Sequence, residues 1–513
     1  MDIKDCLRSA FVAQAVGNKE SNIMRYLSTR GGEPVGAAEA IVRGISPSGG
    51  LYVPETYPKI EVDSSARGSY QSTALRIMRA YLPEMNEDKL GRMIDAAYAS
   101  FDDAEVAPLV KLNDQESVLE LWHGPTMAFK DVALQMLPHL MRESLRLTGE
   151  EKKIYILVAT SGDTGKAALE GFKDVEGTRV LVFYPHGGVS QAQRLQMITQ
   201  EGGNVDVCAV HGNFDDAQTG VKKIFASKGV ADELAKTGWR LSSANSINFG
   251  RLLPQIVYYF TSYETLLARG DIRPGEAVNF CVPTGNFGDI LAGEYARRMG
   301  LPINKLICAS NRNNVLTDFF ESGVYDNNRP FFKSMSCSID ILISSNLERL
   351  LFELAGRNEQ TVCEWMRALK EKGMYALPKA ALDELQRTFA AGWCTEEDTL
   401  KTIRRTYETT GYLMDPHTAV AQCVYERYVR QSGDHTKTML LSTANPYKFA
   451  THVLGAFETT GEDDFINAER LHVVTKTKIP CGISGLLGKP EVHLDVCELK
   501  DMAKRVIAPV KDN

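Results

Sequence analysis

The sequence has no apolar run of about 20 residues, the length that a helix needs to cross a bilayer. It also has no internal repeat and no low-complexity linker. Its ten cysteines form no C-x-x-C pair, and its nine histidines show no H-E-x-x-H or other short ligand spacing, so we expect no metal site. Scattered cysteines of this kind are typical of buried thiols in a reduced, cytoplasmic protein.

The chain also has no excess of positive charge. Its 65 Asp and Glu residues outnumber 58 Lys and Arg residues and leave a formal net charge of −7. This argues against nucleic acid or an anionic membrane as a partner held by bulk charge. The 513 residues, 44% hydrophobic, are enough for two or three globular domains. A short apolar patch at 7–16 carries Arg8 and Gln14, which disfavours a secretory signal. We therefore expect residues 1–23 to be a poorly ordered extension.

Residues 24–108 look mainly helical, with a Gly- and Pro-rich stretch at 46–58. Beyond them, short β-branched runs alternate with helical segments. Strands are predicted at 154–160, 179–185, 205–210, 277–283 and 305–310, and helices at 166–172, 190–199, from 216, and at 290–299. Such alternation predicts an α/β fold with a doubly wound, mostly parallel sheet, in which ligands bind where the carboxyl ends of strands open into loops.

Lys130 directly follows the apolar step 127–129 and begins a helix-like run. Desolvation and the positive end of a helix would both favour its neutral amine. A neutral lysine amine is a nucleophile that can form a Schiff base with an aldehyde cofactor. The alternative is an ordinary surface lysine at the start of an amphipathic helix.

The loop Thr160–Lys166, TSGDTGK, superficially resembles a P-loop. Thr160 stands where that motif requires glycine, and Ala167 stands where it requires Ser or Thr, so we reject a nucleoside triphosphatase site. The remaining features, small hydroxyl residues before a helix, suit an anion or a polar cofactor edge. A capped tight turn is the alternative.

Two further loops follow predicted strands. In Pro283–Asp289, PTGNFGD, two glycines allow successive N–H groups to converge before a helix, a nest suited to a phosphate dianion, although a simple turn remains open. In LSTANPYKF, 441–449, Ser442 and Thr443 emerge at a strand end, where a hydroxyl can donate to a ring nitrogen or merely cap a helix. A lysine, a phosphate nest and a hydroxyl together meet the binding requirement of pyridoxal 5′-phosphate.

The ordered motifs identify a resemblance to a known family. They are YLSTRGG, GGLYVPE, ELWHGPTMAFKDVALQ, ATSGDTG, SSANSINFGRLLPQIVYYF, PTGNFGD and LSTANPYKF. From residue 24 to the last helix, the chain closely resembles threonine synthase, a fold-type-II pyridoxal-phosphate enzyme of the tryptophan synthase β superfamily. The resemblance implies a large cofactor-binding domain at 109–150 and 250–470, a smaller α/β domain at 151–249 and a C-terminal segment at 471–513 that packs on the core.

The resemblance also implies site roles. Lys130 is the Schiff-base lysine, and Asp163 lies near the cofactor 3′-oxygen, where related enzymes often have asparagine. Thr443 contacts the pyridine nitrogen beside Ser442, and Asn445 replaces a histidine of the family. The cofactor phosphate lies on the loop formed by Gly285, Asn286, Phe287, Gly288 and Asp289. Substrate contacts are predicted, from the need to bind a departing phosphate, for Ser161, Thr164, Arg251 and, more weakly, Arg30.

The implied reaction converts O-phospho-L-homoserine and water to L-threonine and phosphate, through elimination of the γ-phosphate and hydration at Cβ. Two alternatives stay open: a phospho-lyase that releases a 2-oxo acid, and a non-catalytic amino-acid sensor of the same fold. We expect a monomer or a homodimer.

Overall fold

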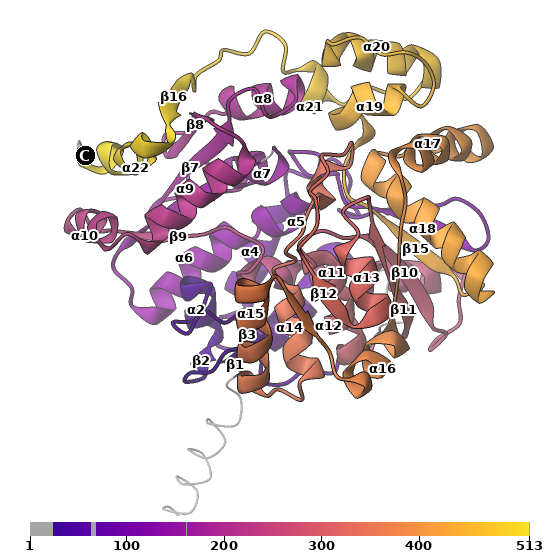
Figure 1. The fold of residues 1–513 in the computed structure, drawn as a ribbon, viewed down its shortest axis with the longest axis horizontal. Helices are drawn as coiled ribbons and strands as arrows, with labels where there is room; N and C mark the ends of the chain where they lie inside the picture. Colours follow the sequence, from indigo (N-terminus) through magenta and orange to yellow (C-terminus); the bar gives the residue numbers. More distant parts are fainter. Residues whose placement is uncertain (1–23, 63–67, 161, 512–513) are drawn as a thin grey trace, which may run out of the picture.

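Two parallel β-sheets with their covering helices dominate the structure, a computed structural model in which residues 24–62, 68–160 and 162–511 are described (Figure 1). The predictions for residues 1–23 and for Ser161 lie outside these residues. Within the described ranges no helix is long and apolar enough to span a membrane. The two sheets confirm the predicted doubly wound, mostly parallel α/β architecture.

The larger sheet has the strand order β14-β11-β10-β15-β5-β4, and only the β4–β5 pair is antiparallel. Every residue of β10 and β15 is buried, as expected for central strands covered on both faces. The carboxyl ends of β5, β10 and β15 therefore meet at one edge of the sheet. The strands are β4 (Leu109–Lys111), β5 (Glu116–Glu120), β10 (Val278–Pro283), β11 (Ile303–Ser310), β14 (Phe389–Trp393) and β15 (Thr438–Ser442).

The smaller sheet is entirely parallel, with the order β16-β8-β7-β6-β9. Its edge strand β16 comes from the C-terminal segment and lies beside β8, although nearly 300 residues separate them (Figure 1). Residues 491–511 therefore pack on the smaller sheet and extend it. The strands are β6 (Lys153–Ala159), β7 (Thr178–Pro185), β8 (Val205–His211), β9 (Trp239–Ser242) and β16 (Asp495–Glu498).

Helices pack against both sheets. Those of the larger sheet and its surroundings are α5 (Lys130–Leu134), α6 (Leu137–Thr148), α11 (Phe249–Arg269), α12 (Gly288–Met299), α13 (Val315–Ser322), α14 (Leu347–Leu354), α15 (Glu359–Lys372), α16 (Lys379–Thr388), α17 (Glu396–Thr410), α18 (Pro416–Ser432), α19 (Ala450–Leu454) and α20 (Asp464–Thr475). Two short 3₁₀ turns, η1 (Cys337–Ile339) and η2 (Pro446–Phe449), and the hairpin β12 (Val324–Asp326) and β13 (Met374–Ala376) belong to the same part. Around the smaller sheet lie α7 (Asp163–Phe172), α8 (Gln191–Ile198), α9 (Phe214–Ala226), α10 (Lys228–Lys236), α21 (Cys481–Ser484), η3 (Leu499–Asp501) and α22 (Met502–Lys511).

Helix α11 brings its first turn into the interior. Almost all of its residues from Phe249 to Leu266 are buried, so the helix is covered on nearly every side. Its cap, Asn248, accepts a hydrogen bond from the Gly250 amide and donates from Nδ2 to Ile41 O over 2.9 Å. This cap holds Arg251, which stands three residues after Asn248, at a fixed depth in the molecule.

The N-terminal part is less purely helical than the sequence predicted. It has α2 (Ala37–Arg43), α3 (Tyr70–Tyr81) and α4 (Glu87–Tyr98), but also a three-stranded antiparallel sheet. The strands β1 (Arg25–Ser28), β2 (Val35–Gly36) and β3 (Tyr52–Pro54) have only two to four residues, too few for an alternating pattern to stand out. β3 lies inside the Gly- and Pro-rich stretch at 46–58, for which the sequence predicted no strand.

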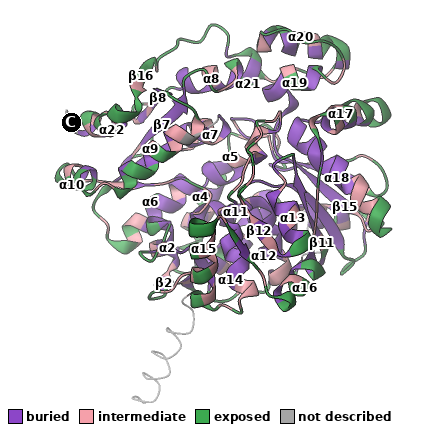
Figure 2. Cartoon of the chain, viewed as in Figure 1, coloured by how far each residue is buried: buried purple, intermediate pink, exposed green. Residues whose placement is uncertain are grey.

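Burial follows the same plan (Figure 2). The central strands and α11 are buried, whereas outer helices such as α10, α15 and α16 show mostly exposed residues. The catalytic candidates therefore lie where two sheets and α11 converge, under cover that excludes much of the solvent.

Two helical glycines allow a test of how closely the two α/β parts pack. An added Cβ at Gly171 in α7 would lie 2.1 Å from Leu134 O at the end of α5, whereas at Gly91 in α4 the nearest atom is 4.0 Å away. Gly171→Ala should therefore cost about 2 kcal/mol or more of unfolding free energy and lower the Tm. The matched Gly91→Ala should gain about 0.5–1 kcal/mol, as alanine does in a helix. Equal Tm values for the two variants would contradict the close approach.

Candidate active site

The loop that carries Lys130 is tied to the loop after β15 by backbone hydrogen bonds. Phe129 N donates to Thr443 O over 2.8 Å, and Asn445 N donates to Met127 O over 3.1 Å. Met127 has a φ of 58°, an uncommon value for a side chain of this size and one typical of functional loops. The two loops therefore form one unit.

The carboxylate of Asp131 also holds this loop in place. It accepts hydrogen bonds from the Thr126 amide over 2.8 Å and from the Thr126 hydroxyl over 2.6 Å. An added Cβ at Gly124 would lie 2.4 Å from Asp131 Cβ, so the residue at position 124 must be small. These contacts hold the backbone immediately before Lys130.

Lys130 is the first residue of α5, and its side chain is 13% exposed. Burial lowers the pKa of Lys130, the positive charges of Lys448 and Arg251 lower it further, and Asp163 opposes them. Lys130 Nζ lies 3.8 Å from Asp163 Oδ2. The structure therefore excludes the alternative of an exposed surface lysine and favours a reactive amine.

Asp163 opens α7 at the carboxyl end of β6, and it faces the Lys130 loop. Its Oδ1 pairs with Lys448 Nζ over 2.8 Å, and its Oδ2 accepts from Ser338 Oγ over 3.0 Å. Burial would raise the pKa of Asp163, but Lys448 and Lys130 outweigh it and hold the pKa well below its usual range. Sequence reasoning missed Lys448 and Ser338, although Lys448 stands in the LSTANPYKF motif that it had singled out.

The loop after β10 fits a phosphate group. Its amides at Gly285, Asn286, Phe287 and Gly288 donate to no other group within the described part of the chain. Phe287 has a φ of 65° and caps α12, so consecutive N–H groups lie at the positive end of a helix. An added Cβ at Gly285 would come within 2.9 Å of Ser338 O. Unpaired amides at a helix start suit an oxyanion better than they suit a simple turn.

Neighbouring side chains hold this loop by its carbonyl groups. Ser344 Oγ donates to Gly285 O over 2.6 Å, and Asn346 Nδ2 donates to Asn286 O over 3.1 Å. The carbonyls are thus occupied while the amides stay free, which is the polarity that an anion requires.

Asp289 belongs to the loop by sequence, but its side chain turns away from the loop amides. Tyr258 Oη donates to Asp289 Oδ1 over 2.5 Å and Tyr259 Oη over 3.2 Å, while Oδ2 has no partner. Burial raises the pKa of Asp289 to about 7, against the lowering effect of the two tyrosines. The carboxyl group of residue 289 is thus directed away from the loop amides, and its predicted contact with phosphate would have to be made by the backbone N–H.

The two hydroxyls at the end of β15 differ in their partners. Ser442 Oγ accepts from Trp122 Nε1 over 3.1 Å and from Thr418 Oγ1 over 3.0 Å. Thr443 is 6% exposed, and its Oγ1 forms no hydrogen bond with another described residue. The free hydroxyl is that of Thr443, in keeping with a contact to a cofactor ring. Asn445 accepts from the Tyr447 amide over 3.0 Å and serves as the cap of η2.

The two arginine candidates lie in different environments. Arg30 forms a two-pronged ion pair with Glu348, through Nε over 2.9 Å and Nη2 over 2.6 Å. Arg251 is 3% exposed and faces no carboxylate; its Nη1 donates to Ala244 O over 2.5 Å and its Nε has no partner. Burial lowers the pKa of Arg251 to about 10. Of the two, Arg251 is the one available to an anion; Thr164, in the first turn of α7, is half-buried and beside Asp163.

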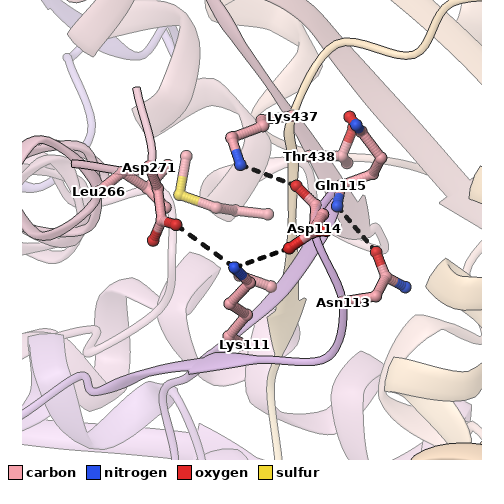
Figure 3. Close-up of a pocket in the computed structure, with 10 residues that line it drawn as sticks. Lys111, Asn113, Asp114, Gln115, Leu266, Asp271, Lys437 and Thr438 are labelled. Atoms are coloured by element: carbon pink, nitrogen blue, oxygen red, sulfur yellow. Dashed lines mark hydrogen bonds and ion pairs between the residues drawn. The ribbon is translucent and has the colours of Figure 1, made fainter. Parts of the chain in front are cut away.

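A pocket at the opposite edge of the larger sheet does not belong to this site (Figure 3). Its charged groups satisfy one another: Lys111 Nζ lies 2.9 Å from Asp114 Oδ1 and 3.5 Å from Asp271 Oδ1, and Lys437 Nζ donates to Asp114 O over 2.7 Å. In the described ranges no cluster of three or more His, Cys, Asp or Glu residues could hold a metal ion.

The buried carboxyl of Asp289 predicts a pH-dependent stability. An unfolded carboxyl loses its proton near pH 4, but the folded one keeps it to about pH 7, so the folded state loses stability as the pH rises through this window. Asp289→Asn keeps an acceptor for both tyrosines and removes the titration. The stability of Asp289→Asn relative to wild type should therefore rise by roughly 2–4 kcal/mol between pH 4.5 and pH 8. Thermal unfolding at several pH values measures it, and parallel Tm curves would contradict it.

Comparison with known proteins identifies the family of the chain. Residues 25–98 match the family described as "Threonine synthase N terminus", and residues 106–385 match "Pyridoxal-phosphate dependent enzyme". Threonine synthase of Pseudomonas aeruginosa is 42% identical over 83% of this chain and 89% of its own length. The crystal structure of PLP-bound threonine synthase from Brucella melitensis superposes with a TM-score of 0.84 at 38% identity, over 94% of this chain and 99% of that one.

A second kind of relative is longer. Threonine synthase-like 1 of Homo sapiens is 41% identical over 82% of this chain, but the chain spans only 58% of that protein's length. The match therefore covers part of the longer protein, whereas it covers most of the bacterial enzymes. The fold type and the family predicted from the motifs are both confirmed, and the chain belongs to the threonine synthase family of pyridoxal-phosphate-dependent enzymes.

Proposed function

We propose that the protein is a threonine synthase, which converts O-phospho-L-homoserine and water into L-threonine and phosphate. The observation that carries the proposal is a buried lysine amine, Lys130, near an uncompensated arginine, Arg251, and at the edge where a loop of free amides begins. The names of relatives that match most of the chain support the same activity. Pyridoxal 5′-phosphate, when bound, delocalises the negative charge that is left when Cα loses its proton.

The charges of the site suit anionic ligands. Lys448 and Arg251 both bring positive charge near the Lys130 amine, and Asp163 pairs with Lys448 and faces Lys130. The cofactor and the substrate each carry a phosphate, and the substrate also carries a carboxylate. An excess of buried positive charge favours their binding, because low-dielectric surroundings strengthen the attraction.

Each residue has a proposed task. Lys130 would hold the cofactor through its aldehyde carbon, and its amine would take the Cα proton of the substrate and return protons later. The amides of the loop 285–288 hold the cofactor phosphate, and Thr443 Oγ1 donates to the ring nitrogen. A neutral hydroxyl there leaves the nitrogen less protonated than a carboxylate would, which suits elimination. Arg251 stabilises the leaving phosphate, with Thr164 and Ser161 as further substrate contacts.

Two other readings lead to different products. A phospho-lyase of the same fold would release a 2-oxo acid without hydration, and an amino-acid sensor would release nothing. Lys130 argues against a sensor, because a sensor has no need of a buried reactive amine. The oligomeric state, monomer or homodimer, and a cytoplasmic location stay predictions.

Product analysis with O-phospho-L-homoserine tests the proposal. We expect L-threonine and phosphate in equal amounts with little 2-oxobutyrate, and borohydride should attach the cofactor permanently to Lys130. Lys130→Ala should lose the yellow colour of the bound cofactor and almost all turnover. Release of 2-oxobutyrate as the main product would favour the phospho-lyase, and a colourless, inactive wild type would favour the sensor. Label on another lysine would refute the role of Lys130.

A further prediction concerns the residue that binds the leaving phosphate. Arg251→Lys keeps a charge but loses the planar fork, so cofactor affinity should stay normal while the KM rises and kcat falls. Arg251→Ala should lose roughly 10²–10³-fold in kcat/KM and most inhibition by inorganic phosphate. Arg30→Lys serves as the matched control, because the structure commits Arg30 to Glu348. If Arg251→Ala retains wild-type phosphate inhibition, the substrate cation lies elsewhere.

A further inference from the structure

A second lysine, Lys448, is buried beside the site and has no assigned role. It lies in η2, five residues after Thr443, and its side chain is 1% exposed. Its ammonium group donates to Asp163 Oδ1 over 2.8 Å and to Thr126 O over 2.8 Å. Fully burying a lysine is costly unless its charge is paired, and here it is paired with the carboxylate that also faces Lys130.

The carboxylate of Asp163 is shared unequally between the two lysines. Lys448 lies within hydrogen-bond distance of Oδ1, whereas Lys130 Nζ lies 3.8 Å from Oδ2, beyond that distance. The remaining capacity of Asp163 is used by Ser338 Oγ at 3.0 Å and, weakly, by Gln193 Nε2 at 3.4 Å. Lys130 is therefore the outer partner of a carboxylate that is already satisfied.

We propose that Lys448 is a positioning residue for the chemistry of Lys130: its ammonium neutralises and anchors Asp163, so that Asp163 does not trap Lys130 in a tight ion pair. The inference deepens the proposed function and rests on the proposed role of Lys130 as nucleophile and base. Lys448 acts through Asp163 and through the loop backbone at Thr126, and it takes no part in bond making.

The bonds of Lys448 also join three parts of the site. Asp163 belongs to the smaller α/β part, whereas Thr126 and Lys448 belong to two loops of the larger one. Thr126 stands four residues before Lys130 in the loop fixed by Asp131. The ammonium group of Lys448 thus fixes both the loop that carries Lys130 and the carboxylate of Asp163 opposite Lys130.

The electrostatic effects of Lys448 on Lys130 have the same sign. Its own positive charge disfavours the ammonium form of Lys130, and its pairing with Asp163 weakens the attraction that would favour that form. The other charged or titratable groups that act on Lys130 are Arg251 from α11 and Cys337 from η1, while His417 from α18 acts on Asp163. None of these three forms an ion pair or hydrogen bond with Asp163 in the described residues.

The test compares three variants with wild type: Lys448→Met, Asp163→Asn and the double variant. The full-length chain, freed of its cofactor, is treated with a trace of an amine-acylating reagent at pH 6–10, and modification of Lys130 is followed by mass spectrometry of its peptide. The midpoint of this pH profile reports the pKa of Lys130. Lys166→Met is the matched control, because Lys166 is also a largely buried lysine of this region, but it pairs with Glu170 over 2.9 Å.

Lys448→Met should raise the midpoint by about one pH unit, which is about a tenfold slower labelling on the acidic limb. Asp163→Asn should lower the midpoint, and the double variant should return it towards the wild-type value. Lys166→Met should leave it unchanged. In the holoenzyme, the acidic limb of the kcat profile should move in the same directions.

Three outcomes overturn the proposal. An unchanged midpoint in Lys448→Met shows that its charge does not reach Lys130. A midpoint that rises equally in Lys448→Met and the double variant shows that solvent has entered the site. An Asp163→Asn midpoint that does not fall removes the carboxylate from the argument, even if Lys448→Met proves unstable. The proposed function fails separately, since borohydride labelling of another lysine refutes Lys130 while leaving these profiles interpretable.

Discussion

The parallel pairing of β15 with β10 on one side and β5 on the other determines where the chemistry can occur. Ser442 at the end of β15 lies opposite Glu120 at the end of β5, so two strands distant in sequence end at the same level. Because β5, β10 and β15 run in the same direction, the loops that follow them all begin at one edge of the sheet. Lys130, the amide loop 285–288 and Thr443 are neighbours for this reason, and backbone bonds such as that of Phe129 to Thr443 then fix the spacing.

Electrostatics add a second constraint that the fold alone does not impose. Two cationic side chains, Lys448 and Arg251, lie near the buried Lys130 amine, and of the two only Lys448 is paired with a carboxylate of the described residues, that of Asp163. Such an arrangement is unfavourable in a dry interior unless anions occupy it. This electrostatic cost of buried positive charge is reduced when phosphate groups bind. The binding of each anion therefore stabilises the folded chain.

The sequence predicted the parts of this design that depend on local pattern. Buried strands such as β6 and β10 are short, mostly apolar runs, and the loops after them carry the motif residues, so fold, family and the Lys130 segment were all accessible. It did not reveal β1–β3, whose few residues give no periodicity, nor β16, whose pairing with β8 depends on contacts nearly 300 residues apart. Side-chain direction was equally hidden. Asp289 looked like a loop ligand, but packing of α12 on α11 turns it to Tyr258 and Tyr259, and nothing in the motif around Lys448 indicated that this lysine pairs with Asp163.

The two phosphate groups of the proposed reaction call for different physics, and the structure offers both. A loop of neutral amides at a helix start binds by preorganised dipoles, without a side chain that must move or titrate, which suits a group that stays bound through many turnovers. In the proposed reaction Arg251 would bind by a formal charge that its surroundings leave uncompensated, and its attraction would grow as negative charge gathers on a departing oxygen. A single cation serving both groups would hold the product as firmly as the cofactor. Separate recognition by dipoles and by charge allows one phosphate to leave while the other remains.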